Sequence, residues 1–503
     1  MSALSTLTTV GVIGAGTMGA GIAQVAAQAG HPVLLFDAAE GAAEVALCKM
    51  TESLQRLIER GKFTPEEVEA ILSRITAATD IHELSPTGLV IEAIVENLSI
   101  KQELFKNLES ICQPETILAS NTSSLSITAI ASVLGRPENF VGMHFFNPAQ
   151  VMKLVEVISG SQTLPDAANI IYDTAQGWGK KPVHAASTPG FIVNRVARPF
   201  YAEALRVLEE GGTDVATIDA IMQASAGFRM GPFELMDLIG NDVNLAVTKS
   251  VFKSFHFDPR FKPSLVQEDM VVSGKLGRKS GSGFYDYGDR ANKFEAIPCA
   301  PEDAPATVTV HGDLGCASSL IGLIENAGIT IDRKGLKSSK GFLRVGAAQL
   351  RLCDGSLATE RGSNTIFFDL ALDYEKATGI ALAPADGSDA AAIGSAVGFF
   401  QALGKSVYLI DDIAGMVAMR TVCMLANEGA DAVNQQVCNE EAVDTAMCFG
   451  VNYPSGPLEW ADAIGIPFVE KVLDNMARVH GEYRYRCSPL IRRKALTNSY
   501  FRT

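Results

Sequence analysis

The sequence predicts an α/β domain followed by an all-α domain, and then a second, altered pair of the same two kinds. Short apolar runs alternate with helical patterns over residues 9–187, helical patterns alone follow residue 188, and many residues of that helical region recur 225 positions later. We therefore expect an α/β domain, a helical domain, a linker rich in Ala, Pro and acidic residues, a degenerate α/β segment and a second helical domain. The expected bounds are 1–187, 188–288, 289–306, 307–410 and 411–503.

The composition argues against several kinds of partner. The 503-residue chain carries 57 acidic and 42 basic residues, a net charge of -15, and no run of Lys and Arg. This balance disfavours nucleic acid and anionic membrane surfaces. The nine cysteines are scattered, without the spacing of a zinc site, so we expect no metal, and reduced thiols in a cytoplasm.

Residues 1–36 contain no Asp, Glu, Lys or Arg, which raises the alternatives of a membrane helix or a signal peptide. The stretch "TVGVIGAGTMGAGIAQVAAQAG", residues 9–30, holds six glycines and no leucine, and the first basic residue is Lys49. Glycine is a poor interior helix residue, and a signal peptide begins with positive charge. Both alternatives are therefore disfavoured.

The same stretch is typical of a strand, a tight turn and a helix that are all buried. Residues 9–13 are rich in β-branched residues, residues 14–19 match G-x-G-x-x-G, and "HPVLLFD" predicts a second strand that ends at Asp37. In a Rossmann-type fold the turn receives a pyrophosphate at a helix N-terminus, and the acidic residue accepts the ribose hydroxyls. No cation follows Asp37 before Lys49, so NAD is favoured over NADP. The residues predicted to form the turn are Gly14, Gly16, Thr17, Met18 and Gly19.

Polar residues follow the later predicted strands of this domain, where a doubly wound sheet binds its ligands. Glu96 and Lys101 follow "LVIEAI", residues 121–124 (Asn-Thr-Ser-Ser) follow "TILAS", and "MHFFNP" contains His144 and Asn147. Each has a structural alternative. Residues 121–124 could cap a helix that begins near residue 127, Glu96 and Lys101 could be a solvated pair, and an isolated His144 would most often be a core residue.

His144 has a carboxylate within reach if two strands flank the turn at Asn147. Glu156 lies twelve residues beyond it in the following strand, "KLVEVI". A carboxylate beside an imidazole fixes its tautomer and raises its basicity. Hydride can leave a carbinol carbon only if the hydroxyl proton also leaves, and a neutral imidazole is the usual acceptor. The pair therefore indicates dehydrogenase chemistry.

These motifs together resemble the L-3-hydroxyacyl-CoA dehydrogenase family over residues 8 to about 288. They are "GAGTMG", "SNTSS", "HFFNP", "MKLVEVI", "STPGFIVNR" and "GPFELMD". The resemblance implies that His144 is the general base, that Glu156 orients it, and that Ser123 and Asn194 hydrogen-bond the substrate oxygens. It also places Glu96, Lys101, Asn147 and Lys279 on the NAD side, and Ser53 and Arg60 at coenzyme A. Arg60 stands where the family pattern has lysine.

The helical region is duplicated in the second half. A shift of 225 superposes Gly190 on Gly415, Arg195 on Arg420 and Glu203 on Glu428. The copy has Met419 where the first has Asn194, its glycine turn reads "VHGDLG", and no second "HFFNP" exists. We therefore expect a structural second half that packs on the first as an intrachain pseudo-dimer, with a homodimer as the alternative.

This two-copy arrangement resembles the 3-hydroxyadipyl-CoA dehydrogenases of phenylacetate catabolism, with 3-hydroxybutyryl-CoA or general fatty-acid 3-hydroxyacyl-CoA dehydrogenases as alternatives. The far carboxylate of an adipyl chain would need a cation, for which Arg198 and Arg229 are the candidates; the structural alternative is that they stabilise helix packing. Two rival functions remain: a dehydrogenase of free β-hydroxy acids, and a non-catalytic NAD-binding structural protein.

Overall fold

The computed structural model describes residues 3–288, 294–335 and 341–502. The first residues of the expected linker, 289–293, lie outside this range. The described chain forms two compact units, residues 1–195 with 436–452, and residues 196–435 with 453–503. Among the described residues no helix is long and apolar enough to cross a membrane.

The first unit is built on an eight-stranded sheet in the order β3-β2-β1-β4-β5-β6-β7-β8. All neighbouring strands are parallel except β6 and β7, which are antiparallel. The strands are β1 (Val10–Ile13), β2 (Val33–Phe36), β3 (Ile75–Ala78), β4 (Leu89–Glu92), β5 (Ile117–Ser120), β6 (Phe140–Phe145), β7 (Leu154–Ser159) and β8 (Lys181–Ala186). Buried strands such as β1 and β4 need no polar face, which explains the long uncharged N-terminal stretch.

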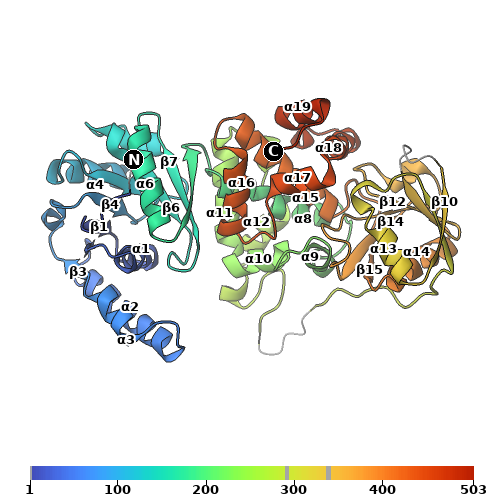
Figure 1. Ribbon diagram of the computed structural model, residues 1–503, viewed down its shortest axis with the longest axis horizontal. Helices are drawn as coiled ribbons and strands as arrows, with labels where there is room; N and C mark the ends of the chain where they lie inside the picture. The colour runs from blue at the N-terminus through green and yellow to red at the C-terminus, as the bar shows by residue number, and fades with distance from the viewer. Residues whose placement is uncertain (1–2, 289–293, 336–340, 503) are drawn as a thin grey trace. The chain divides into compact units, whose positions relative to one another are not determined.

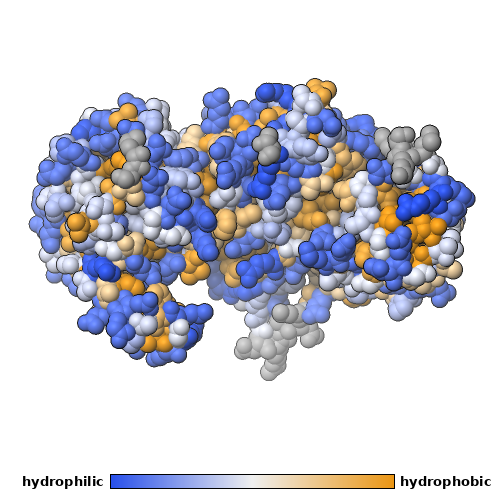
Figure 2. All heavy atoms as spheres, viewed as in Figure 1, coloured by the Kyte–Doolittle hydropathy of each residue, from blue (hydrophilic) through white to orange (hydrophobic). Residues whose placement is uncertain are grey.

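Helices connect these strands. They are α1 (Thr17–Gln28), α2 (Ala42–Glu59), α3 (Pro65–Leu72), α4 (Leu98–Ile111), α5 (Ile127–Ala131), α6 (Pro165–Gly177) and α7 (Val193–Val196). Figure 1 shows α2 and α3 as a helical hairpin that projects from the sheet, and Figure 2 shows its surface as mostly hydrophilic with a small apolar patch. Thr64 and Glu67 form a capping box that starts α3.

The second unit contains a mixed seven-stranded sheet in the order β10-β9-β11-β12-β13-β14-β15. The pairs that include β11, and the pair β13–β14, are antiparallel, and the other pairs are parallel. The strands are β9 (Thr307–His311), β10 (Thr330–Lys334), β11 (Phe342–Val345), β12 (Ala348–Leu352), β13 (Thr365–Phe368), β14 (Gly379–Pro384) and β15 (Ser406–Leu409). Helices α13 (Leu320–Asn326) and α14 (Ala390–Ala402) belong to the same segment.

Two groups of helices come from the repeated regions. The first group is α8 (Arg198–Glu209), α9 (Val215–Ala224), α10 (Pro232–Ile239), α11 (Asn241–Ser254) and α12 (Leu265–Val272). The second is α15 (Ala418–Asn434), α16 (Glu440–Gly450), α17 (Pro457–Ile464), α18 (Ile466–His480) and α19 (Pro489–Thr497). Helix α16 belongs to the first compact unit, whereas the other helices in both groups belong to the second.

The 225-residue register extends well beyond the helices in which the sequence revealed it. Strands β6, β7 and β8 start 225 residues before β13, β14 and β15, and α6 starts 225 residues before α14. Two buried lysines repeat the same hydrogen bonds. Lys180 donates to the carbonyls of Ala149 and Met152, and Lys405 donates to those of Tyr374 and Ala377. Part of the α/β domain is therefore duplicated in register.

At the position that corresponds to His144, the second half has Asp369. The carboxylate of Asp369 accepts the N–H groups of Val417, Ala418 and Met419 at 2.7 to 3.0 Å, next to the start of α15. Burial raises the pKa of Asp369 to about 6, against the opposing effect of these N–H donors. The acid of the second half thus holds a helix start where the first half has an imidazole.

Candidate active site

The glycine turn joins β1 to α1 at the carboxyl end of β1. Gly14 has a φ of +99°, a conformation that glycine adopts readily. A Cβ on Gly19 would lie 1.7 Å from the carbonyl oxygen of Gly14, so helix and turn require this glycine to pack closely. A Cβ on Gly16 would meet no atom within 4 Å. Its hydrogen leaves open space in front of the turn.

This turn is suited to an anion. Gly16 is the N-cap of α1 and supplies no side-chain hydrogen bond to the first N–H groups of the helix. Those groups and the helix dipole therefore remain available to a pyrophosphate. Asp37 lies directly after β2, and its carboxylate accepts the N–H of Ala15 at 2.7 Å and that of Ala39 at 2.9 Å. These bonds hold the acid beside the turn.

Glu96 connects the ends of two neighbouring strands. Its carboxylate accepts hydrogen bonds from the hydroxyls of Thr122 at 2.6 Å and Ser124 at 2.7 Å, and from the N–H of Ser123 at 3.2 Å. Burial alone would raise the pKa of Glu96, but the bonds from Thr122 and Ser124 outweigh it and the pKa is lowered. The predicted cap alternative is wrong, because the N-cap of α5 is Ser126.

Lys101 is buried, with 1% of its side chain exposed, and its ammonium contacts both Glu92 and Glu96. The alternative of a solvated Glu96–Lys101 pair is therefore wrong. Glu92 also accepts a hydrogen bond from the hydroxyl of Ser120 at 2.6 Å. The sequence analysis missed Glu92 and Ser120. A glutamate inside the apolar run "LVIEAI" was the available signal, because a buried acid needs a partner.

His144 and Glu156 lie directly opposite each other on the antiparallel strands β6 and β7. The distance from His144 Nδ1 to Glu156 Oε2 is 2.7 Å. The strand-turn-strand pattern in the sequence predicted this proximity. The rings of Phe146 and Phe191 lie 4.5 and 6.0 Å from the imidazole, centroid to centroid. With Nδ1 at the carboxylate, Nε2 is the nitrogen left to accept a proton.

The other oxygen of Glu156 holds the start of α7. Glu156 Oε1 accepts the N–H groups of Ile192 and Val193, both at 3.0 Å. The next residue is Asn194, whose amide nitrogen lies 3.4 Å from the carbonyl oxygen of Ser123. The first unit thus brings together the strand pair of His144 and Glu156 and the residue pair of Ser123 and Asn194.

The remaining predicted residues are more dispersed. Asn147 is exposed two residues after β6, and Ser53 and Arg60 are exposed at α2. Three further residues belong to the second compact unit: Lys279, Arg198 and Arg229. Lys279 pairs there with Asp242.

Comparison with known proteins gives the family. The model described as "3-hydroxyacyl-CoA dehydrogenase, NAD binding domain" matches residues 9–188, and the model of the C-terminal domain of these enzymes matches residues 190–287 and again 415–502. The 3-hydroxyadipyl-CoA dehydrogenase of Escherichia coli K12 is 42% identical over 98% of both chains. The chain belongs to the 3-hydroxyacyl-CoA dehydrogenase family. It is therefore an NAD-dependent oxidoreductase, and the predicted duplication of the C-terminal domain is confirmed.

Other relatives in the family separate the two halves. A probable 3-hydroxybutyryl-CoA dehydrogenase of Deinococcus radiodurans is 46% identical over 55% of this chain and 99% of its own. A crystal structure described as 3-hydroxybutyryl-CoA dehydrogenase from Escherichia coli K12 covers 98% of this chain and 99% of its own, with a TM-score of 0.89 and 42% identity. Residues 350–413 match a model described as "3-hydroxybutyryl-CoA dehydrogenase reduced Rossmann-fold domain".

Proposed function

We propose that the protein oxidises (3S)-3-hydroxyacyl-CoA to 3-oxoacyl-CoA with His144 as the general base. The observation that carries this proposal is the 2.7 Å contact between His144 and Glu156. Glu156 keeps the proton on Nδ1, so Nε2 takes the proton of the 3-hydroxyl group. NAD, when bound, accepts the hydride. Ser123 and Asn194, which lie together, hydrogen-bond the oxygens of the substrate and favour charge that develops on them.

The turn of residues 14–19, including Thr17 and Met18, holds the pyrophosphate of NAD in this proposal, and Asp37 binds the ribose hydroxyls. The open space at Gly16 and the uncapped start of α1 support this assignment. Glu96, Asn147, Lys101 and Lys279 act on the NAD side. Because Lys101 is buried against Glu92 and Glu96, its part is to position Glu96. Ser53 and Arg60 bind coenzyme A.

The preferred substrate in our proposal is 3-hydroxyadipyl-CoA, in phenylacetate catabolism. The full-length similarity to the Escherichia coli 3-hydroxyadipyl-CoA dehydrogenase supports it. Arg198 supports it independently, because this arginine is 6% exposed and forms no ion pair with an acid in the part of the chain that the structure describes. A buried, uncompensated charge is costly unless a ligand neutralises it.

The surroundings of Arg198 suit a carboxylate. Arg198 lines a cavity of about 130 Å³ within the second unit. Its Nη1 donates to the hydroxyl of Thr248 at 3.2 Å, and its Nε has no hydrogen-bond partner. Burial lowers the pKa of Arg198. Arg229, the other candidate, is exposed, so Arg198 is the better candidate for the far carboxylate.

The test compares NADH formation with 3-hydroxyadipyl-CoA and 3-hydroxybutyryl-CoA. We expect the wild-type protein to prefer the dicarboxylate. Arg198→Met should raise KM for 3-hydroxyadipyl-CoA by roughly 10- to 100-fold, the value of a charge-assisted hydrogen bond, and leave 3-hydroxybutyryl-CoA nearly unchanged. Arg229→Met is the matched control.

Equal preference in the wild type would instead favour the 3-hydroxybutyryl-CoA alternative, which the description of the similar crystal structure supports. An unchanged preference in Arg198→Met would remove Arg198 from the substrate site. Activity with free 3-hydroxy acids, or no activity at all, would contradict the proposed reaction.

We also propose that one chain acts alone as a pseudo-dimer in the cytoplasm, where its nine cysteines stay free thiols. The two halves exchange helices. Helix α16 of the second half packs on β7 and β8 of the first sheet, and α9 of the first half packs on β14 of the second. The N–H of Ala186 donates to Val437, and 225 positions later that of Asp411 donates to Gly212. Light scattering should give the mass of one chain; twice that mass would favour the homodimer.

A further inference from the structure

The second α/β segment contains a cavity that the proposed dehydrogenase chemistry does not use. It has a volume of about 250 Å³ and lies within the second unit. Residues at or just beyond the carboxyl ends of β9, β12 and β13 line it, together with α18. Open α/β sheets bind ligands at this edge. The volume is slightly below the roughly 300–1,000 Å³ of typical small-molecule pockets, so a ligand would be small.

One side of the cavity is cationic. Arg361 and Lys471 both pair with the single carboxylate of Asp354, Arg361 at 3.0 Å. Arg351 has no ion pair with any acid among the described residues, and its guanidinium lies 4.5 Å from the centre of the Phe342 ring. Burial, and the nearby charge of Arg361, lower the pKa of Arg351. Three cations therefore face Asp354 and the exposed Asp313, which leaves one positive charge in excess.

The opposite side of the cavity is apolar. Leu352, Phe367 and Phe468 contribute to it, with Phe468 on α18. An apolar wall facing a few placed polar groups is the usual composition of a small-molecule site. A ligand with a hydrocarbon body and one negative charge would satisfy both sides.

The turn after β9 excludes a dinucleotide. Asp313 stands in this turn, and its carbonyl oxygen accepts the N–H of Gly341 at 2.8 Å. A Cβ on Gly341 would lie 2.2 Å from that oxygen, so the chain at residue 341 closes over the turn. The carboxylate of Asp313 would in addition repel a phosphate. The space that remains suits a monoanion.

We propose that this cavity binds a small organic carboxylate, with its carboxylate at Arg351 and its hydrocarbon body against Leu352, Phe367 and Phe468. A guanidinium offers a carboxylate two parallel N–H donors. The proposal does not depend on which acyl-CoA the first half oxidises.

The test is calorimetric titration of the full-length protein with hexanoate and, separately, with inorganic phosphate. We expect saturable binding of hexanoate and none of phosphate. Arg351→Met, which keeps the stem but removes the charge, should weaken hexanoate binding by roughly tenfold or more, and Arg351→Lys by less. Arg493→Met is the matched control, because Arg493 is exposed on α19, away from the cavity lining.

A second variant reports on the cavity directly, whether or not Arg351→Met folds. Phe468→Trp places an indole in the apolar wall, and its fluorescence should change saturably with hexanoate. Hexanoate binding that Arg351→Met leaves unchanged, phosphate binding as tight as that of hexanoate, or no change in Phe468→Trp fluorescence would each overturn the proposal.

Discussion

We expect His144→Gln to lower kcat by roughly 10²- to 10⁴-fold, the range typical of a positioned general base, with little change in KM for NAD. Glutamine keeps a polar side chain at this position, but its amide cannot take the proton of the 3-hydroxyl group. Steady-state NADH formation with a 3-hydroxyacyl-CoA, over a range of NAD concentrations, measures both parameters. A loss smaller than roughly tenfold would contradict the role of His144 as the base.

Glu156→Gln is the informative control for that substitution. The amide oxygen can still accept the N–H groups of Ile192 and Val193 that Glu156 Oε1 accepts now, so α7 should keep its start. The negative charge beside Nδ1 is lost, so the imidazole becomes a weaker base. We therefore expect a smaller loss of kcat than in His144→Gln and a shift of the pH profile toward higher pH.

The second half of the chain separates the two tasks of Glu156. Asp369, at the position of His144, keeps a carboxylate on the start of α15, while the position of Glu156 holds Ala381, which carries no acid. Helix anchoring thus persists without the imidazole-carboxylate pair. The pair in the first half therefore serves chemistry, because anchoring alone requires one carboxylate.

The sequence predicted those parts of the site in which neighbouring residues act together. The glycine turn, Asp37 and the His144–Glu156 strand pair each depend on spacing within one strand-turn-strand or strand-turn-helix unit. The burial of Lys101 against Glu92 could not be predicted this way, because it depends on how α4 packs against the sheet. The exchange of α9 and α16 is likewise a long-range contact.

The second sheet shows the limit of pattern reading more clearly. The sequence analysis found β9, β10, β13 and β15, but it missed β11, β12 and β14. Strand β14 reads "GIALAP", which is poor in β-branched residues. It forms because its neighbours β13 and β15 pair with it. Its 225-residue register with β7 survives in the backbone although the side chains that would reveal it have changed.

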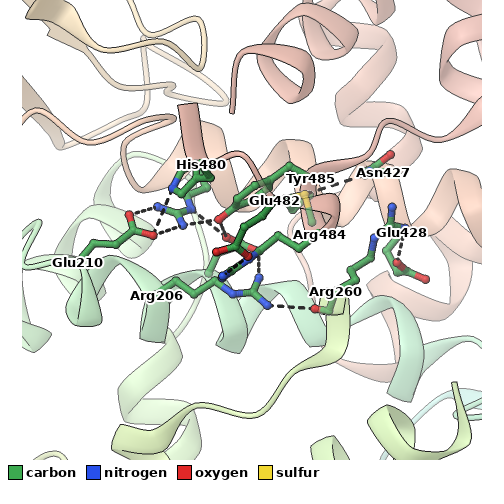
Figure 3. Close-up of polar contacts among 12 residues, drawn as sticks. Arg206, Glu210, Arg260, Asn427, Glu428, His480, Glu482, Arg484 and Tyr485 are labelled. Carbon is green, nitrogen blue, oxygen red and sulfur yellow. Dashed lines mark hydrogen bonds and ion pairs between the residues drawn. The ribbon is translucent and has the colours of Figure 1, made fainter. Parts of the chain in front are cut away.

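The largest expected effect on stability comes from a buried cluster of charges in the second unit. Arg420 is fully buried; its Nε donates to Glu203 at 2.8 Å, and its two terminal nitrogens donate to the two oxygens of Glu210, each at 2.7 Å. Arg206 and Tyr485 also contact Glu203. Figure 3 shows Glu210 beside His480 in this cluster, with Arg206 and Tyr485 close by.

We expect Arg420→Met to destabilise the second unit by about 3–5 kcal/mol, because removing one partner of a buried ion pair leaves an uncompensated charge. Urea unfolding followed by Trp460 fluorescence in a Trp178→Phe background reports on this unit, since Trp460 lies in it and Trp178 in the other. Arg492→Met is the control. Arg492 pairs with Asp474 but is 44% exposed, so its loss should cost under about 1 kcal/mol.

The pH dependence of this difference identifies the charge responsible. Burial would raise the pKa of Glu203, but Arg206 and Arg420 outweigh it and the pKa is lowered. A lowered pKa contributes stability that is present above the unfolded-state pKa and is lost as pH falls through the folded one. The cost of Arg420→Met should therefore be full at neutral pH and shrink only below the ordinary carboxyl range. A cost equal to that of Arg492→Met, or one independent of acid, would mean that packing rather than charge holds α8 against α15.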